Sequence, residues 1–239
     1  MTLWHLSRAI LETAWISAPT VLDGVTGRLT AETCDARLDS WSRRLLYQAR
    51  IRVGVSGLEN LPAGESFVIM SNHQSLYDIP TVYQALRPRR VRMVAKTELF
   101  RVPVWSAAMR AAGFVEVDRQ DRERAIASLR EARRAITSGT NIWIAPEGTR
   151  SATGKLARLK KGGFHLALDT GTRILPLSIS GTRAVLVARG FTVHPGALVS
   201  VVVQAPVDPA SYGAEGLERL IYAVRQAILS GLPGAPEQD

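Results

Sequence analysis

A histidine and an aspartate five residues apart are the first candidates for chemistry in this chain of 239 residues. His73 follows an apolar run that predicts a β-strand, and Asp78 opens a segment with helical spacing. Across such a turn the carboxylate can fold back on the imidazole, hold it in one tautomer and stabilise its protonated form. Acyl transfer to an alcohol needs a general base of this kind, because a hydroxyl does not ionise usefully at neutral pH. The pair is therefore a candidate catalytic dyad; the alternative is that Asp78 only caps a helix.

The candidate dyad comes without a recognisable nucleophile. The chain contains no Gly-x-Ser-x-Gly elbow, and its single cysteine, Cys34, lies in the N-terminal region that reads as helical. We therefore expect the acceptor hydroxyl to attack a thioester directly, with no acyl-enzyme intermediate.

A second candidate site follows the apolar run at residues 141–144. An arginine, a conformationally permissive glycine and two hydroxyls at the end of a strand form a plausible phosphate cradle. The alternative is an ordinary turn. Two lysines and two glycines open the next predicted helix and add cations and free backbone amides. The segments are Pro146-Glu147-Gly148-Thr149-Arg150-Ser151 and Lys160-Lys161-Gly162-Gly163.

Short apolar runs alternate with helical periods after residue 50, which predicts a mainly parallel sheet covered by helices on both faces. The predicted strands are residues 51–55, 67–71, 91–95, 114–117, 141–145, 174–180 and 198–204. The predicted helices are residues 79–86, 104–112, 121–137, 161–170 and 216–229.

The first fifty residues predict two amphipathic helices. Apolar residues recur at three- to four-residue spacing, with aromatic positions Trp4, Trp15 and Trp41 among them. Arginines border these apolar faces, at positions 8, 37, 43, 44 and 50. This pattern favours helices that lie at a membrane interface. The alternative is a helical hairpin packed on the main domain.

Composition narrows the partners. The net charge is +9, and basic residues cluster, with six Lys or Arg against one acid between Arg150 and Arg173. Such clusters favour phosphate-bearing ligands or an anionic lipid surface, and the alternative is a solvated basic face. Nucleic acid is not expected, because the chain has no zinc finger, no RNP-like aromatic motif and no Gly-rich nucleotide loop.

Two further absences bear on location. No run reaches the roughly 18 apolar residues that span a bilayer, and the first residues lack the basic region of a secretory signal. We expect a peripheral protein on the cytoplasmic face of the cell membrane.

The chain resembles the bacterial 1-acyl-sn-glycerol-3-phosphate acyltransferases from about Ile51 to Asp208. Four sequence blocks occur in the order and at the spacing that this family shows. The first block is an N-H-x4-D motif, and the third is the Pro-Glu-Gly-Thr-Arg segment. The blocks are Asn72-His73 with Asp78, residues 113–119, residues 146–151 and residues 174–182.

The resemblance assigns roles to particular residues. It implies that His73 is the general base and Asp78 its partner. It implies that Lys96, Arg119 and Arg150 contact the phosphate of the acceptor. It implies that Glu147 and Gly148 shape this phosphate site, and Thr149 belongs to the same predicted set.

The resemblance also implies a reaction and a fold. A fatty acyl group passes from acyl-CoA or acyl-carrier protein to the sn-2 hydroxyl of lysophosphatidate, giving phosphatidate without a metal or other cofactor. The α/β fold is one domain with a mixed, mainly parallel sheet (residues 51–239), preceded by a membrane-associating helical pair (residues 1–50).

Three departures from the family pattern leave the acceptor open: Ser106, Glu116 and Ala145. Another lysolipid, such as a lyso-ornithine lipid, is therefore an alternative acceptor. Two further readings are a thioester hydrolase and a non-catalytic lipid-binding protein, although loss of the dyad would be expected for the latter.

Overall fold

Seven strands form one sheet in the computed structural model, which describes residues 2–102, 105–117 and 122–234, apart from a few side chains that include Lys96. The strand order is β1-β7-β6-β2-β5-β3-β4. The strands are β1 (Arg52–Ser56), β2 (Val68–Ser71), β3 (Val91–Lys96), β4 (Val115–Val117), β5 (Asn141–Ile144), β6 (Ile174–Ser180) and β7 (Leu198–Val203). All seven predicted strands are present, with ends that shift by at most one residue.

The sheet is parallel except at one pair. Strand β2 lies between β5 and β6 and runs parallel to both. Strand β6 pairs with β7 in the antiparallel sense, with Ile179 opposite Val201. The prediction of a mixed, mainly parallel sheet is confirmed.

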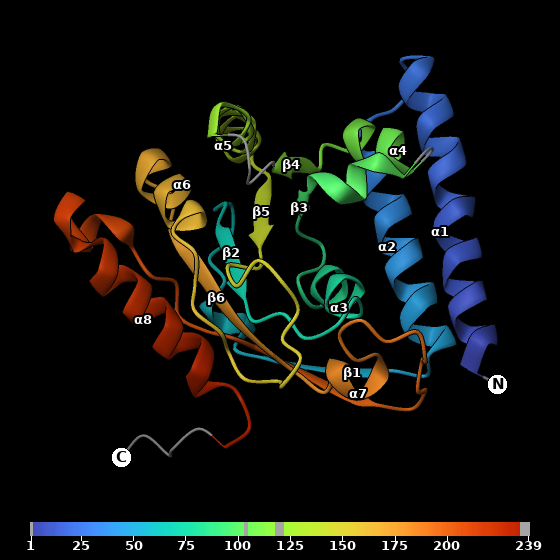
Figure 1. The fold of residues 1–239 in the computed structure, drawn as a ribbon. Helices are drawn as coiled ribbons and strands as arrows, with labels where there is room; N and C mark the ends of the chain where they lie inside the picture. Colours follow the sequence, from blue (N-terminus) through green and yellow to red (C-terminus); the bar gives the residue numbers. More distant parts are fainter. Residues whose placement is uncertain (1, 103–104, 118–121, 235–239) are drawn as a thin grey trace.

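Helices cover both faces of this sheet (Figure 1). They are α3 (Asp78–Ala85), α4 (Trp105–Ala111), α5 (Arg122–Thr137), α6 (Gly162–Thr170), α7 (Thr182–Val185) and α8 (Leu217–Ser230). The predicted starts at residues 104 and 121 lie outside the described residues. Helix α7 was not predicted, because four residues are too short to show a helical period.

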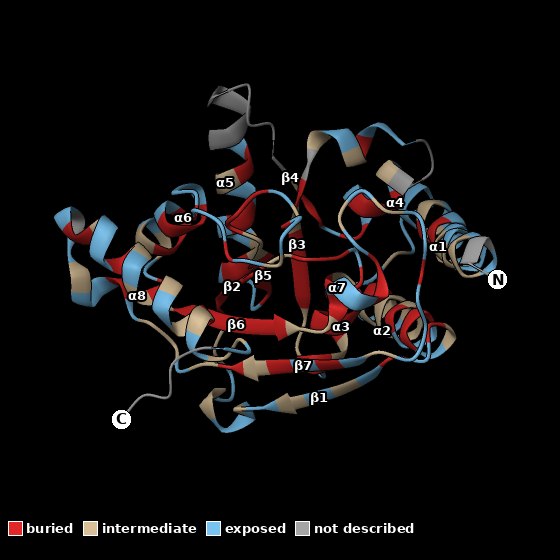
Figure 2. Cartoon of the chain, turned by 60° about the horizontal axis from the view of Figure 1, so that its bottom comes forward, coloured by how far each residue is buried: buried red, intermediate tan, exposed pale blue. Residues whose placement is uncertain are grey.

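Strand β2 shows why its sequence reads as one apolar run. Ile69 packs in the cluster that joins α2, α3 and α4 to the sheet. Val68 and Met70 point the other way, into the cluster with α5, α6 and α8. Successive side chains of a strand alternate between faces, so a strand covered on both sides is apolar throughout. In Figure 2 the central strands are buried, whereas the outer faces of α1 and α8 are exposed.

The N-terminal residues form two helices, α1 (Thr2–Val25) and α2 (Ala31–Gln48), that lie side by side (Figure 1). Thr30 caps α2 by accepting a hydrogen bond from the Thr33 amide at 3.1 Å. Gly24 lies where α1 crosses α4, since a Cβ there would come within 2.9 Å of Ala111 Cβ.

Helix α2 shares a core with the rest of the protein. Its residues Cys34 and Leu46, with Ala49 just beyond, are buried in the same cluster as the sheet residues Ile69 and Leu177. The predicted division at residue 50 therefore runs between segments that share one hydrophobic core.

Helix α1 has an exposed side and a side that lines a cavity with residues such as Thr13 and Ser17. Trp4 and Trp15 are 61% and 76% exposed on the outer side. Trp41 does not belong to that outer face. It points inward, donates a hydrogen bond to Thr13 Oγ1 at 3.1 Å and lies edge-on to Tyr83. Of the helices in the described part of the chain, none is both long and apolar enough to cross a lipid bilayer.

Candidate active site

The candidate site lies where three neighbouring parallel strands end. The segments that follow β2, β5 and β6 leave the sheet at the same edge, because these strands run in the same direction. Ligand sites of open α/β sheets are found at this carboxyl edge. The N-H-x4-D segment follows β2, and the Pro-Glu-Gly-Thr-Arg segment follows β5.

His73 and Asp78 form the predicted pair. His73 Nδ1 lies 2.7 Å from Asp78 Oδ2, the side chain of Asp78 is fully buried, and that of His73 is 17% exposed. An ionised carboxylate makes Nδ1 the protonated nitrogen and leaves the Nε2 lone pair available to accept a proton. The geometry is that of a general base and its orienting carboxylate.

The carboxylate of Asp78 is held by the backbone of its own turn. Asp78 Oδ2 accepts hydrogen bonds from the amides of Gln74, at 2.7 Å, and Ser75, at 2.9 Å. With the imidazole of His73, these two amides make three donors to this one oxygen, and hydrogen bonds to an ionised acceptor are strong. Oδ1 has no hydrogen-bond partner among the described residues. Asp78 is also the first residue of α3, so the helix start and the dyad are built by one residue.

Neighbouring side chains fix the turn against the sheet. The Asn72 amide donates to Ile179 O at 2.7 Å and accepts from Ile179 N at 2.8 Å, which extends the contact between β2 and β6. The ring of Trp143, on β5, lies edge-on to the imidazole of His73 with centroids 6.2 Å apart. Ser75 Oγ donates to Leu186 O at 2.8 Å. The contacts of Ser75 and Trp143 were not predicted. A side chain that binds the backbone of a residue far away in the sequence, or that packs across strands, leaves no local sequence pattern.

Glu147 joins the two motif segments. Its Oε1 accepts from the His73 amide and its Oε2 from the Ala157 amide, both at 2.8 Å. The residue is 4% exposed, and this burial raises the pKa of Glu147, an effect that the two backbone amides oppose. A carboxylate held in this way positions the His73 backbone; as an anion it is not suited to contact a phosphate.

The other predicted phosphate residues lie at the same edge. Gly148 is buried with φ of 75°, so the turn after β5 needs a residue that tolerates the left-handed region. Thr149 is exposed and Arg150 is partly exposed. Within the described residues the Arg150 guanidinium makes no hydrogen bond or ion pair, so it is available to bind an anion.

The two remaining predicted cations are described less fully. Lys96 ends β3, which pairs with β5, so its backbone is at the same edge; its side chain is outside the described part. Arg119 also lies outside the described residues.

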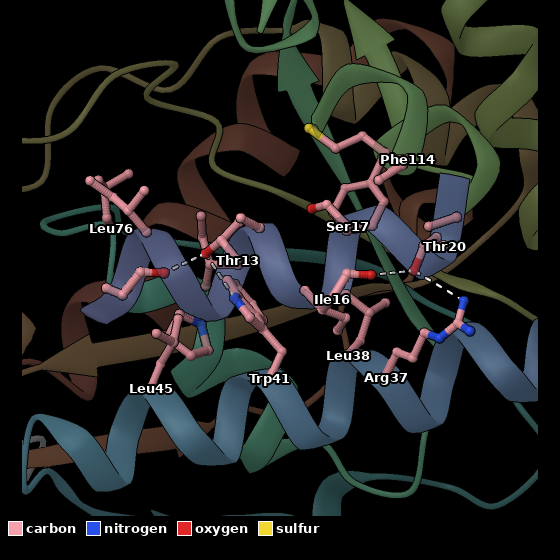
Figure 3. A pocket seen from close by; sticks show the side chains of 18 of the residues that line it. Thr13, Ile16, Ser17, Thr20, Arg37, Leu38, Trp41, Leu45, Leu76 and Phe114 are labelled. Carbon is pink, nitrogen blue, oxygen red and sulfur yellow. Dashed lines mark hydrogen bonds between the residues drawn. The ribbon is translucent and has the colours of Figure 1, made fainter. Parts of the chain in front are cut away.

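An apolar cavity of about 400 Å³ begins beside the dyad. Leu76 and Tyr77, from the turn between His73 and Asp78, line one part of it, and α1, α2 and α4 supply most of the remaining wall. Figure 3 shows Leu76 near one end of α1 and the Thr20–Arg37 hydrogen bond near the other. Burial raises the pKa of Tyr77 to about 12, so its hydroxyl stays neutral and adds no charge to the wall. The space suits a hydrocarbon chain.

No group of three or more His, Cys, Asp or Glu side chains that could hold a metal ion occurs in the parts of the chain that the structure describes. The expectation that the reaction needs no metal or other cofactor stays a prediction.

Comparison with known proteins identifies the family of this chain. Residues 52–180 match the model of the Acyltransferase family. The chain is 32% identical to a 1-acyl-sn-glycerol-3-phosphate acyltransferase of Chlamydomonas reinhardtii, over 76% of this chain and 53% of that protein. It is 32% identical to 1-acyl-sn-glycerol-3-phosphate acyltransferase alpha of Mus musculus, over 79% of this chain and 67% of that protein. The chain belongs to the acyltransferase family, as the resemblance predicted.

A bacterial relative and a solved structure extend the comparison. The chain is 29% identical to the 1-acyl-sn-glycerol-3-phosphate acyltransferase of Borreliella burgdorferi, over 78% of this chain and 74% of that protein. The crystal structure of the 1-acyl-sn-glycerophosphate acyltransferase PlsC from Thermotoga maritima superposes with a TM-score of 0.78 at 27% identity, covering 95% of this chain and 91% of that one. The chain spans about half the length of the algal relative and of two plant chloroplast relatives.

Proposed function

We propose that this protein transfers a fatty acyl group from a thioester carrier to the sn-2 hydroxyl of lysophosphatidate, forming phosphatidate. The observation that carries the proposal is the His73–Asp78 pair, with Nδ1 bound to a buried carboxylate at 2.7 Å beside an apolar cavity. The names of the relatives support lysophosphatidate as the acceptor.

The proposed reaction is a direct transfer. His73 Nε2 takes the proton of the acceptor hydroxyl as its oxygen attacks the thioester carbonyl. The C–S bond then breaks, and the leaving thiolate receives the proton from the imidazolium. In the described part of the chain no Ser, Thr or Cys side chain is hydrogen-bonded to the His73 ring, which favours this route over an acyl-enzyme.

Substrate binding divides between the cavity and the cations of the sheet edge. The cavity would hold an acyl chain. The guanidinium of Arg150, which has no partner among the described residues, would bind the phosphate of the acceptor, with Lys96 and Arg119 as further proposed contacts. The thioester is carried by CoA or by acyl-carrier protein. Neither a metal nor another cofactor takes part in the proposed reaction.

Membrane association is part of the proposal. The acceptor is a bilayer lipid, and the exposed tryptophans of α1 support a peripheral location with this helix on the lipid surface. The predicted cytoplasmic face belongs to the same proposal.

The test is to incubate the purified protein with a panel of lysolipids and both types of donor, and to identify the products by mass spectrometry. Phosphatidate formed from lysophosphatidate, unaffected by a metal chelator, would support the proposal. Faster acylation of a lyso-ornithine lipid would change the acceptor. Thioester cleavage that is independent of any lysolipid would show a hydrolase, and lipid binding without turnover would show a non-catalytic protein.

A further inference from the structure

A tight turn follows α7 and is ordered by its own backbone. The amide of Gly190 donates to Val187 O at 3.0 Å, and Arg189 between them has φ of 63°. A Cβ on Gly190 would come within 2.6 Å of Val187 Cγ2, so this position favours glycine. His194 N donates to Val185 O at 2.8 Å, so residues 186–193 form a loop that is closed at its base. Its tip therefore has a defined conformation.

The loop has an inner and an outer side. Leu186 and Val193 line the apolar cavity and are 2% and 1% exposed. Val187 and Phe191 are 44% and 74% exposed. One side of the loop is thus a wall of the cavity, and the other presents apolar side chains to the outside.

The loop lies beside the dyad and the helical pair. Ser75, from the dyad turn, donates through Oγ to Leu186 O at 2.8 Å. Gly196 N donates to Ala49 O at 2.9 Å, just after α2, and Figure 1 shows the segment after α7 passing this end of α2. Ile10 and Leu76 line the cavity yet are 60% and 44% exposed, so the cavity opens at these residues, and Leu76 directly follows the Ser75 that contacts the loop.

The charges around the outer side of this loop indicate which kind of partner binds it. Arg183 and Arg189 are exposed in and before the turn, and residues 170–207 contain no Asp or Glu. On α1, Arg8 lies over the ring of the exposed Trp4, at 5.5 Å. Exposed aromatic and aliphatic side chains bordered by arginines fit the interface of an anionic bilayer.

We propose that the Val187–Phe191 turn is a membrane contact in its own right, which inserts Phe191 into the interfacial region of an anionic phospholipid bilayer. With α1 on one side and this turn on the other, the mouth of the cavity rests on the lipid. An acyl chain then passes between bilayer and cavity without crossing water. The inference rests on the proposed function, because it assumes that the acceptor is a bilayer lipid.

Site-specific fluorescence tests the contact. Phe191→Cys and the matched control Tyr222→Cys, an exposed aromatic position on α8 on the other side of the sheet (Figure 1), are labelled with an environment-sensitive thiol dye. Unsubstituted protein measures any labelling of the buried Cys34. On addition of vesicles of phosphatidylcholine and phosphatidylglycerol, the label at position 191 should shift to the blue and that at position 222 should not. An unshifted label at position 191 on protein that sediments with the vesicles would overturn the inference.

A charge substitution gives an independent measurement. Phe191→Asp should weaken vesicle binding by about tenfold or more, the factor that burial of one large apolar side chain contributes. Tyr222→Asp should leave it unchanged. Equal binding by both folded variants, or a change in the oligomeric mass of Phe191→Asp without vesicles, would contradict the inference; the latter would show that a second copy covers the loop.

Acylation of lysophosphatidate by the unsubstituted protein is measured separately, in detergent micelles. Absence of acylation would contradict the proposed function, whatever the fluorescence shows. A blue shift at position 191 would then still place the loop in lipid.

Discussion

At the scale of single residues, both members of the proposed dyad should be needed for turnover, each for its own reason. His73→Ala removes the base and should lower kcat by about 10²–10⁴-fold. Asp78→Asn keeps the shape of the side chain but favours the wrong imidazole tautomer, so a similar loss is expected. Steady-state rates with a saturating thioester donor measure both.

Matched controls for the dyad lie on α6, where His165 and Asp169 are exposed. His165→Ala and Asp169→Asn should turn over at the wild-type rate. Rates within a few-fold of wild type for His73→Ala would remove this residue from the mechanism.

Glu147 was predicted to belong to the phosphate site, whereas its carboxylate binds the backbone amides of His73 and Ala157. Glu147→Gln keeps one carbonyl oxygen but presents an NH₂ group to the second backbone amide, so one of two hydrogen bonds is lost. Because the His73 backbone loosens, kcat should fall by about 10- to 100-fold. The KM for the lysolipid should change little. A raised KM with an unchanged kcat would instead indicate a direct substrate contact.

Glu147 should also affect stability as a function of pH. Its raised pKa means that the folded protein holds this proton more tightly than the unfolded chain. Its contribution to stability is complete below the ordinary pKa of 4.5 and is lost as the pH rises through the higher folded value. The stability of wild type relative to Glu147→Gln should therefore decrease with rising pH, as measured by urea unfolding.

Arg150 is partly exposed at the carboxyl edge of the sheet, and its guanidinium has no partner among the described residues. Arg150→Lys should raise the KM for lysophosphatidate and leave the KM for the thioester almost unchanged, because an ammonium cannot form two parallel hydrogen bonds to a phosphate. Arg158→Lys, at an exposed position of the same loop, is the control. Equal effects of Arg150→Lys on both KM values would mean that its charge acts on the surface as a whole.

At the scale of elements, the sequence predicts where the strands lie but not which elements they pair with or pack against. Strands buried on both faces give apolar runs, as Val68, Ile69 and Met70 of β2 illustrate. The antiparallel pairing of β6 with β7 depends on contacts across the sheet and leaves no local pattern. Trp41 was expected on the outer face because helical spacing shows that apolar residues share a side but does not show what they pack against.

One of the polar contacts that hold α2 against the sheet involves a nearly buried cation. Arg92 Nη1 lies 2.7 Å from Asp35 Oδ1, with side chains that are 6% and 32% exposed. Asp35→Ala would leave the Arg92 charge without its carboxylate and would also remove the 2.8 Å contact of Asp35 with Arg90, so the free energy of unfolding should fall by about 1–3 kcal/mol. Glu32→Ala removes a carboxylate that pairs with Arg90 at the exposed surface and should have almost no effect. Chemical denaturation of both variants measures the difference, and equal stabilities would show that the Arg92–Asp35 pair does not contribute to the docking of α2.

For the molecule as a whole, α1 should serve two functions through its two sides. Its outer tryptophans, Trp4 and Trp15, are exposed, whereas Ala9, Thr13 and Ser17 line the cavity. Trp4→Ser combined with Trp15→Ser should lower vesicle binding and activity on membrane-embedded acceptor, since each buried indole contributes about 1.5–3 kcal/mol. Turnover of a short-chain acceptor in micelles should fall much less, because the wall of the cavity is intact.

Removing the whole helix should give a different result. Deletion of residues 1–29 ends before the Thr30 cap of α2, keeps the core residues of that helix, and opens the cavity along the side that α1 covers. Both membrane activity and micellar turnover of long-chain substrates should therefore be lost, while a short-chain acceptor is still used if the dyad turn stays folded. Circular dichroism and a thermal melt establish that the shortened protein is folded, and co-sedimentation with vesicles at low and high salt measures binding. A folded deletion variant with wild-type long-chain turnover in micelles would show that α1 is a membrane contact only and that the cavity it lines does not hold the acyl chain.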